Sequence, residues 1–430
     1  MIPWIFLAVS IIGAGFTINA DRPSSRWQLL GVSFFAGWLT GELALFHLAW
    51  QLVATVVFVS LGALDEVPGV VGLTISIASW IGLLWIQVVA LRSARVIERA
   101  LRAGLGDDYR SHIAPGLAER LARRASTLRL LFPFYLRDRR VERVKNIQYA
   151  TGAGRRHRLD VYRPRAGVEH APVLLQIHGG AWVIGDKGQQ GLPLMLHLAA
   201  RGWVCVANNY RLSPRAKFPE HLVDCKLALA WVRQHIAEYG GNPDFVVVTG
   251  GSAGGHLASL VALTRNDRAF QPGFEGVDTS VSACVPFYGV YDLADVFQGR
   301  RGPARASHRF ERMLMGTTVE DDRAAFEQAS PIHHVSDDDP PFFVIHGAND
   351  NLVPVAQARQ FVAALRAVSH EPVLYAEVPG ASHAFEIFNS VRTANAVFGV
   401  ERFLAWLYSA YQARHPEAPA EPAREAAGSS

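Results

Sequence analysis

The chain has 430 residues, with 42 Lys and Arg against 38 Asp and Glu, which gives a formal net charge of +4. Half of its residues are apolar and 19% are charged, against about 25% charged residues in an ordinary soluble protein. This composition excludes a disordered chain, which combines low hydrophobicity with high charge. Three widely spaced cysteines exclude a small disulfide-built domain.

The first third of the chain predicts an all-α transmembrane region over residues 1–91. Residues 2–20 and 67–91 contain no charged residue, and residues 27–64 contain only Glu42. Since about 20 apolar residues cross the hydrocarbon core, the first and last stretches are one helix each. The middle stretch predicts one helix within residues 36–61, preceded by an interfacial turn around 27–35. A two-helix hairpin is the alternative.

Flanking charges favour three membrane helices over four. The first loop contains Arg22 and Arg26, the second loop is acidic, and four arginines follow the last span between residues 92 and 102. Three helices put both basic segments on the cytoplasmic side, where such residues accumulate, whereas four would leave Arg22 and Arg26 outside. The apolar start lacks the basic residues of a cleaved signal peptide. The rest of the chain is therefore expected in the cytoplasm.

Glu42 is the one charge within these apolar stretches, and such a residue is a candidate functional site. Because Gly41 stands beside it, we favour an interfacial position.

The segment that follows, residues 92–143, predicts a basic amphipathic linker beside the membrane. Residues 92–145 contain fourteen basic and six acidic residues, net +8, whereas the parts before and after are each net −2. This distribution favours membrane lipids over nucleic acid as the partner of the charge. Within the linker, leucines recur among arginines in residues 109–136. That pattern predicts an amphipathic helix, which either lies in the membrane interface or packs on the next domain.

Residues 144–412 predict an α/β domain, and residues 413–430, rich in Pro, Ala and Glu, predict a disordered tail. Short apolar segments predict strands at residues 173–177, 203–208, 245–249, 283–287, 342–345 and 373–378. Helix-like stretches alternate with them, including residues 219–239, 256–264 and 355–369. This alternation indicates a mostly parallel sheet with helices on both faces. Ligands bind at the carboxyl ends of such strands.

Ser252 follows the predicted strand at 245–249 within the sequence Gly-Gly-Ser-Ala-Gly-Gly, and a helix pattern comes next. A strand, a G-x-S-x-G turn and a helix form a nucleophile elbow, in which the serine hydroxyl is exposed on a sharp turn. Glycines at both flanks avoid collisions in that turn. Ser252 is therefore the candidate nucleophile.

A second glycine motif, His-Gly-Gly-Ala-Trp at residues 178–182, follows the strand at 173–177. The backbone amides of Gly179 and Gly180, together with that of Ala253, are candidates for an oxyanion hole. His178 precedes the serine, and we expect it to orient this loop rather than act as the base.

A serine nucleophile needs a base and an orienting acid. Asp350 follows the strand at 342–345, and His383 follows the strand at 373–378. The order Ser252, Asp350, His383 is that of α/β-hydrolases. Asp292 also follows a strand and competes as the acid. We expect His256, on the helix after the serine, to point away from it.

Neither a metal nor a cofactor is expected. Cys225 and Cys284 lack metal-ligand spacing, and the pair at residues 333–334 is expected on a loop surface.

With these motifs the chain resembles the α/β-hydrolase superfamily, specifically its hormone-sensitive-lipase-like carboxylesterases and its isoprenylcysteine-methylesterase-like group. The resemblance covers residues 144–410 and includes residues 209–214 and 218–219 besides the glycine, serine, aspartate and histidine loops. Gly251 stands where an acidic residue often precedes the serine, and Ala181 where a third glycine is common. Because of these departures the motifs do not assign the subfamily or the substrate, but the three triad residues are all present.

The resemblance implies a serine carboxylesterase or lipase that acts on small-molecule or lipid esters through an acyl-enzyme. The membrane anchor is expected from the apolar N-terminal stretches, which are not part of that family pattern. An amidase or formamidase and a catalytically silent membrane scaffold are the alternatives. The acyl chain, the alcohol and the oligomeric state stay open.

Overall fold

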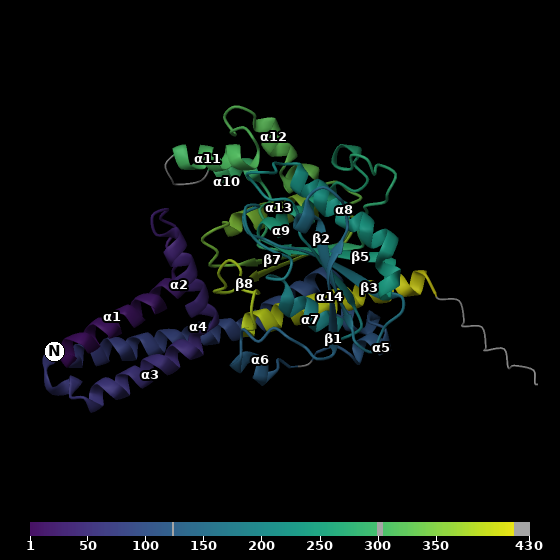
Figure 1. Cartoon of the computed structure of the whole chain (residues 1–430). Coiled ribbons are helices and arrows are strands. Elements are labelled where there is room, and N and C mark those ends of the chain that lie inside the picture. Colours follow the sequence, from purple (N-terminus) through teal and green to yellow (C-terminus); the bar gives the residue numbers. More distant parts are fainter. Residues whose placement is uncertain (123, 299–303, 417–430) are drawn as a thin grey trace, which may run out of the picture.

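A computed structural model describes residues 1–122, 124–298 and 304–416, in which a helical bundle leads into an α/β domain (Figure 1). The bundle consists of α1 (Ile2–Asp21), α3 (Ala44–Ser60) and the first part of α4 (Val67–Leu105). By length and composition α1 and α4 can each cross a membrane. The helix pair α2 (Leu30–Glu42) and α3, bent by 90°, is a third candidate span. Helix α2 thus takes the place of the expected interfacial turn, and the bend at Leu43 divides the single helix that was expected within residues 36–61.

Small and hydroxylated residues hold α1 against α4. Thr17 Oγ1 lies 2.8 Å from Ser79 Oγ, and Ser76 Oγ donates to Ser10 Oγ at 2.9 Å. A Cβ at Gly72 would lie 3.2 Å from the backbone of Leu7. Close backbone approach and interhelical hydrogen bonds are the interactions that hold helices together in lipid, where the hydrophobic effect does not drive their association.

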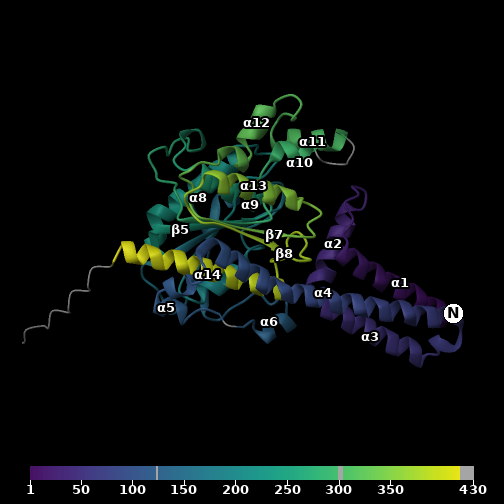
Figure 2. The same cartoon turned by 180° about the vertical axis from the view of Figure 1, so that it is seen from behind.

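Helix α4 does not end at residue 91, where the sequence predicted a linker, but runs to Leu105 and joins the α/β core. Ile97 and Leu101 are fully buried there, and Asn395 donates to Ser93 Oγ at 2.9 Å. The arginines that end the apolar stretch do not end the helix, because an amphipathic face lets it continue onto the domain. One rigid helix therefore links the bundle to the domain (Figure 2).

The domain is built on one eight-stranded sheet with the order β1-β2-β4-β3-β5-β6-β7-β8. Its strands are β1 (Val141–Gln148), β2 (Arg158–Pro164), β3 (Ala171–Ile177), β4 (Val204–Asn208), β5 (Gly241–Gly251), β6 (Ala283–Phe287), β7 (Phe342–Gly347) and β8 (Val373–Val378). Strand β2 pairs antiparallel with both of its neighbours, β1 and β4. All other neighbouring strands pair in parallel. The six predicted strands and the mostly parallel sheet are confirmed; β1 and β2, more polar, were not predicted.

Helices cover both faces of this sheet, as predicted. Helices α8 (Glu220–His235), α9 (Ala253–Leu263) and α13 (Val355–Val368) pack on one face. Helices α7 (Leu192–Ala199), α14 (Val391–Arg414) and the end of α4 pack on the other. The shorter helices α10 (Leu293–Gln298), α11 (Ala304–Leu314) and α12 (Arg323–Gln328) lie between β6 and β7 along the chain. Six 3-10 helices also occur in the described part, at Ala63–Asp65, Tyr109–His112, Gly154–His157, Ile236–Tyr239, Arg268–Phe270 and Pro331–His334.

Residues 109–136 do not form the single amphipathic helix that was expected. They contain the short helices α5 (Pro115–Ala118) and α6 (Thr127–Leu131), because Pro115 limits the helix that would otherwise run through. The first half packs on the domain through Ile113 and a hydrogen bond from the Ala114 amide to Ser409 Oγ. In the second half, Leu128, Leu131, Phe132, Phe134 and Tyr135 are exposed, whereas Pro133 is buried. The predicted tail, residues 413–430, lies outside the described residues from 417 on.

Candidate active site

Ser252 lies on a sharp turn between β5 and α9, at the carboxyl end of the central strands. Its backbone has φ +59° and ψ −124°, a conformation that non-glycine residues rarely adopt. A Cβ at Gly254 would collide with the Ile177 carbonyl oxygen, so glycine is required there. Ser252 Oγ has no hydrogen-bond partner among the described residues, so that the hydroxyl is available to a substrate.

The loop after β3 approaches this turn closely. A Cβ at Gly179 would lie 3.2 Å from Ser252 Cβ, and Gly180 has φ +115°, in the region that favours glycine. The Gly179 amide donates to Gln190 Oε1 at 2.6 Å. Among the described residues, the Gly180 and Ala253 amides have no acceptor. Of the three predicted oxyanion donors, two are therefore free, and Gly179 is instead bound to the side chain of Gln190.

His178 holds this loop in place through contacts with Gly179 and Tyr210. Its Nδ1 lies 2.7 Å from the Gly179 carbonyl oxygen, and its ring stacks on Tyr210 at 4.4 Å between centroids. Burial lowers the pKa of His178 to about 4, so the ring is neutral at pH 7. The Tyr210 hydroxyl also donates to the His178 carbonyl at 2.9 Å.

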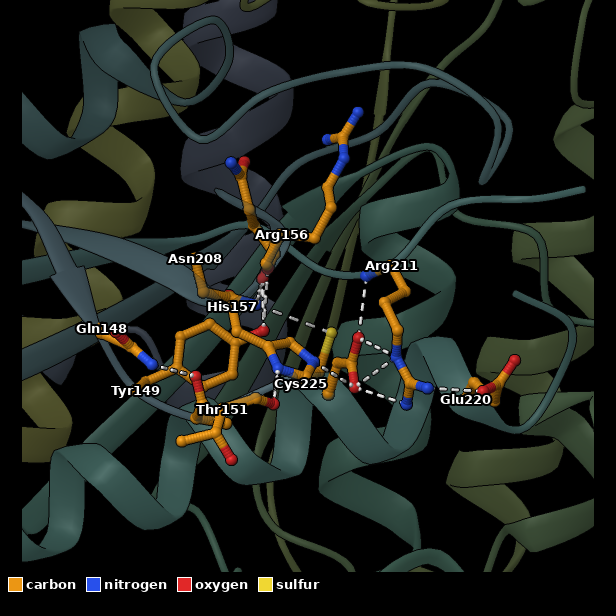
Figure 3. A network of polar contacts seen from close by, with 12 residues as sticks. Gln148, Tyr149, Thr151, Arg156, His157, Asn208, Arg211, Glu220 and Cys225 are labelled. Atoms are coloured by element: carbon orange, nitrogen blue, oxygen red, sulfur yellow. Dashed lines mark hydrogen bonds and ion pairs between the residues drawn. The ribbon is translucent and has the colours of Figure 1, made fainter. Parts of the chain in front are cut away.

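The segment that carries Tyr210 is fixed by a buried polar network (Figure 3). Arg211 donates to both carboxylate oxygens of Asp224 and pairs with Glu220, while His157 Nε2 lies 3.1 Å from Asp224 Oδ1. The Tyr149 hydroxyl donates to the Asn209 carbonyl at 2.7 Å. Side chains from α8, from the 3-10 helix Gly154–His157 and from the loops after β1 and β4 thus hold the segment under the glycine loop.

Asp350 and His383 come together from the loops after β7 and β8. His383 Nδ1 lies 2.6 Å from Asp350 Oδ2, while Asp350 Oδ1 accepts from the amides of Leu352 and Val353 at 2.9 and 2.8 Å. Burial opposes ionisation, but the charge of His383 and a hydrogen bond from His346 lower the pKa of Asp350 well below its usual range. The ionised carboxylate only accepts, so Nδ1 carries the proton and Nε2 is left for the serine.

Tyr288 connects the elbow to the histidine. Its ring packs on His383 with centroids 4.5 Å apart, and a Cβ at Gly251 would lie 3.0 Å from that ring. The hydroxyl of Tyr288 donates to Glu386, whose carboxyl is buried. Burial raises the pKa of Glu386 from 4.5 to about 7. A side chain at residue 251 would displace Tyr288, which gives a local reason for the glycine before the serine.

The competing candidates are engaged elsewhere. The Asp292 amide donates to Gln357 Oε1, and its carboxylate caps the Asp295 amide at 2.9 Å. His256 Nε2 lies 2.6 Å from the Ala329 carbonyl, away from the serine. Cys225 and Cys284 are buried, and the described residues contain no cluster of His, Cys, Asp and Glu that could hold a metal ion.

Aromatic residues of the N-terminal region, which the sequence did not connect with the site, reach the histidine loop. The Phe34 ring on α2 meets the His383 ring edge-on at 6.2 Å, and Trp38 packs on Phe388 at 5.2 Å. Phe134, after α6, also packs on Phe388, with the ring centroids 4.9 Å apart. No local signal in an apolar helix identifies such a long-range contact.

Polar contacts dock the same region onto the domain. Glu42, at the end of α2, pairs with Arg392 at 3.2 Å and accepts from Ser390 Oγ at 2.7 Å, and both Glu42 and Arg392 are almost fully buried. Asn349, next to Asp350, donates to the Asp21 carbonyl at 2.9 Å. Glu42 is therefore buried between the bundle and the domain, and not exposed at the membrane surface as an interfacial position would require.

Comparison with known proteins agrees with this architecture. The BD-FAE family matches residues 159–365. The chain is 44% identical to the probable carboxylic ester hydrolase LipM of Mycobacterium tuberculosis over 428 residues, 96% of either chain. It is 28% identical to the isoprenylcysteine alpha-carbonyl methylesterase of Arabidopsis thaliana over 51% of this chain and 52% of that one.

Among solved structures, a truncated carbohydrate esterase from gut microbiota superposes with a TM-score of 0.53 at 25% identity, over 61% of this chain and 96% of that chain. The predicted α/β-hydrolase resemblance and the predicted ester hydrolase activity are confirmed. Since the match to LipM takes in almost the whole length of both chains, this chain belongs to the LipM family of α/β-hydrolase carboxylic ester hydrolases.

Proposed function

We propose that the chain is a membrane-anchored serine esterase in which Ser252 is the nucleophile, His383 the general base and Asp350 the orienting acid. The observation that carries the proposal is the 2.6 Å contact between His383 Nδ1 and the buried Asp350 carboxylate. His383 Nε2 takes the serine proton as Oγ attacks the ester carbonyl, and then protonates the leaving alcohol. Water next attacks the acyl-enzyme with His383 again as base, which releases the acid and restores the serine.

The oxyanion that forms in each step is held by the amides of Gly180 and Ala253, one such donor being worth about 2.7–4 kcal/mol. The Gly179 amide becomes a third donor only when its hydrogen bond to Gln190 Oε1 is broken. Catalytic hydrogen bonds to a serine often tighten only when substrate is bound, which fits a Ser252 hydroxyl that is unpartnered without it.

The serine assignment is tested with Ser252→Ala in the full chain. We expect loss of ester hydrolysis and of labelling by an organophosphonate, with an unchanged melting temperature. A variant that keeps more than a few per cent of wild-type turnover would refute the assignment, and an inert but well-folded wild type would favour a scaffold role. Matched anilides, tested beside the esters, separate esterase from amidase activity.

The membrane anchoring rests on α1, α4 and the bent pair α2–α3, which we propose as three spans with the catalytic domain in the cytoplasm. Support comes from the basic residues that flank the first and last helices. A reporter fused after residue 430 should be active only on the cytoplasmic side. A reporter active only outside would overturn this orientation.

The substrate class that we propose is an ester of a lipophilic acid or alcohol that reaches the site from the bilayer. The contact of Phe34 with His383 supports it, because the same helix exposes Val32 and Phe35 on its outer side. We place residues 109–136 near the entrance to the site, where Phe134 packs on Phe388. A panel of esters of rising acyl length in lipid nanodiscs tests this; preference for short soluble esters alone would refute the substrate class.

A further inference from the structure

A cavity of about 210 Å³, separate from the serine and the histidine, lies between α6, α7 and the start of α14. Four arginines line it: Arg124, Arg129, Arg140 and Arg201. No carboxylate is among its lining residues in the described part of the chain. His197 also lines the wall, and burial lowers its pKa, so the imidazole is neutral at pH 7.

Two acids behind the wall neutralise part of this charge. Asp138 accepts from Arg129 and from Arg140, each at 2.7 Å. Glu401 pairs with Arg201 at 2.9 Å. Four guanidinium groups against two carboxylates leave a surplus of two positive charges.

Part of this positive charge remains available to a ligand. Arg124 has no ion-pair partner in the part of the chain that the structure describes, and Arg140 shares its carboxylate with Arg129. Burial and the neighbouring Arg140 charge lower the pKa of Arg201, as expected where cations crowd together. An anion in the cavity would relieve that repulsion.

Helix α6, which lines the cavity through Arg129 and Leu130, also carries exposed apolar side chains. Leu128, Leu131, Phe132 and Phe134, on α6 and the turn after it, are each about 60% exposed. Four large apolar side chains exposed within seven residues, next to arginines, are typical of a segment that lies in the membrane interface.

Helix α6, which lines the cavity, lies beside the junction of α4 and α14 in both views (Figures 1 and 2). Ser390, which lines the cavity, donates to Glu42 at the bend between α2 and α3. On α4, the Arg92 guanidinium lies 4.8 Å from the Trp85 ring centroid, an aromatic and basic pair of the kind found at membrane surfaces.

We propose that this cavity binds the phosphate head group of an anionic phospholipid, whose acyl chains cover the exposed side chains of α6. Arginine forks match phosphate oxygens in charge and geometry. Free phosphate shares that chemistry but would leave the exposed apolar side chains of α6 uncovered. We therefore assign the site to the lipid. The inference rests on the membrane anchoring proposed above and is independent of the triad.

The test variant is Arg124→Gln combined with Arg140→Gln. It removes two of the four cations, while Asp138 keeps Arg129 and Glu401 keeps Arg201, so neither acid is left unpaired. The control variant combines Arg268→Gln with Arg414→Gln, which removes the same charge from exposed positions elsewhere. Melting temperature and turnover of a short soluble ester should be unchanged in both, which separates this site from the catalytic one.

Lipid retention is measured by native mass spectrometry on the full chain in detergent with equal phosphatidylglycerol and phosphatidylcholine. We expect the wild type and the control to retain one phosphatidylglycerol preferentially. The test variant should retain it at least about tenfold more weakly, since each basic residue near an anionic surface is worth roughly a fivefold change in affinity.

Three outcomes would overturn the proposal. They are equal retention of both lipids by the wild type, an equal loss in the control variant, and full displacement of phosphatidylglycerol by millimolar inorganic phosphate, which would make the cavity a site for the free anion. Should turnover of the short ester vanish in the wild type while lipid retention behaves as expected, the catalytic proposal alone would fail.

Discussion

Replacing Asp350 by Asn tests the orientation of the catalytic histidine, because the two oxygens of Asp350 have different partners. Oδ1 accepts from the backbone amides of Leu352 and Val353, whereas Oδ2 faces His383 Nδ1. In the variant, only the amide oxygen can accept from the two backbone amides. The NH₂ group must then face His383.

An NH₂ group in that position reverses the tautomer of the histidine. Nδ1 becomes an acceptor, the proton moves to Nε2, and Nε2 can no longer take the proton of Ser252. A wrong tautomer costs about 10⁴-fold in kcat, or about 5 kcal/mol of transition-state stabilisation. Because both backbone hydrogen bonds survive, the fold should be unaffected.

The assay is kcat for a chromogenic short ester with the full chain in detergent, beside a thermal melt. Asp292→Asn is the matched control, since the Asp292 carboxylate caps the Asp295 amide and does not contact His383. If Asp350→Asn keeps more than a tenth of wild-type kcat, or if Asp292→Asn loses as much, the argument from the tautomer is wrong.

Three further changes have definite expected outcomes. Glu386, with a pKa raised by burial to about 7, holds a proton when folded that the unfolded chain releases above about pH 4.5. The melting temperature should therefore fall as pH rises from about 5 to 7, and Glu386→Gln should flatten that fall; an equally steep fall in the variant would contradict it. Glu42→Ala leaves Arg392 buried without its carboxylate, which should cost about 3–5 kcal/mol of stability; a detergent melt unchanged from wild type would count against it. Phe34→Ala should lower kcat/KM for long-chain esters about tenfold relative to short ones, and a uniform change across the panel would remove Phe34 from the substrate path.

Local sequence determined six of the eight strands and the position of the proposed catalytic groups along the chain. A run of buried, β-branched residues such as 173–177 has few alternatives to a central strand, and glycine and serine after a strand demand a turn. Since parallel strands end at the same edge of a sheet, motifs after β3, β5, β7 and β8 had to lie near one another. The candidates Ser252, Asp350 and His383 therefore followed from the residues that come after each strand and from their order along the chain.

What only the tertiary structure decided depends on contacts between residues far apart in the chain. Helix α4 continues past its apolar part because Ile97 finds a place in the domain core, which no charge pattern predicts. The Gly179 amide is occupied by Gln190, and Phe34 meets His383, through side chains whose positions are set by packing. Helix α2 and the His383 loop, so far apart in the sequence, can be joined only by the fold, because hydrophobic burial is not directional and leaves no sequence mark of its partner.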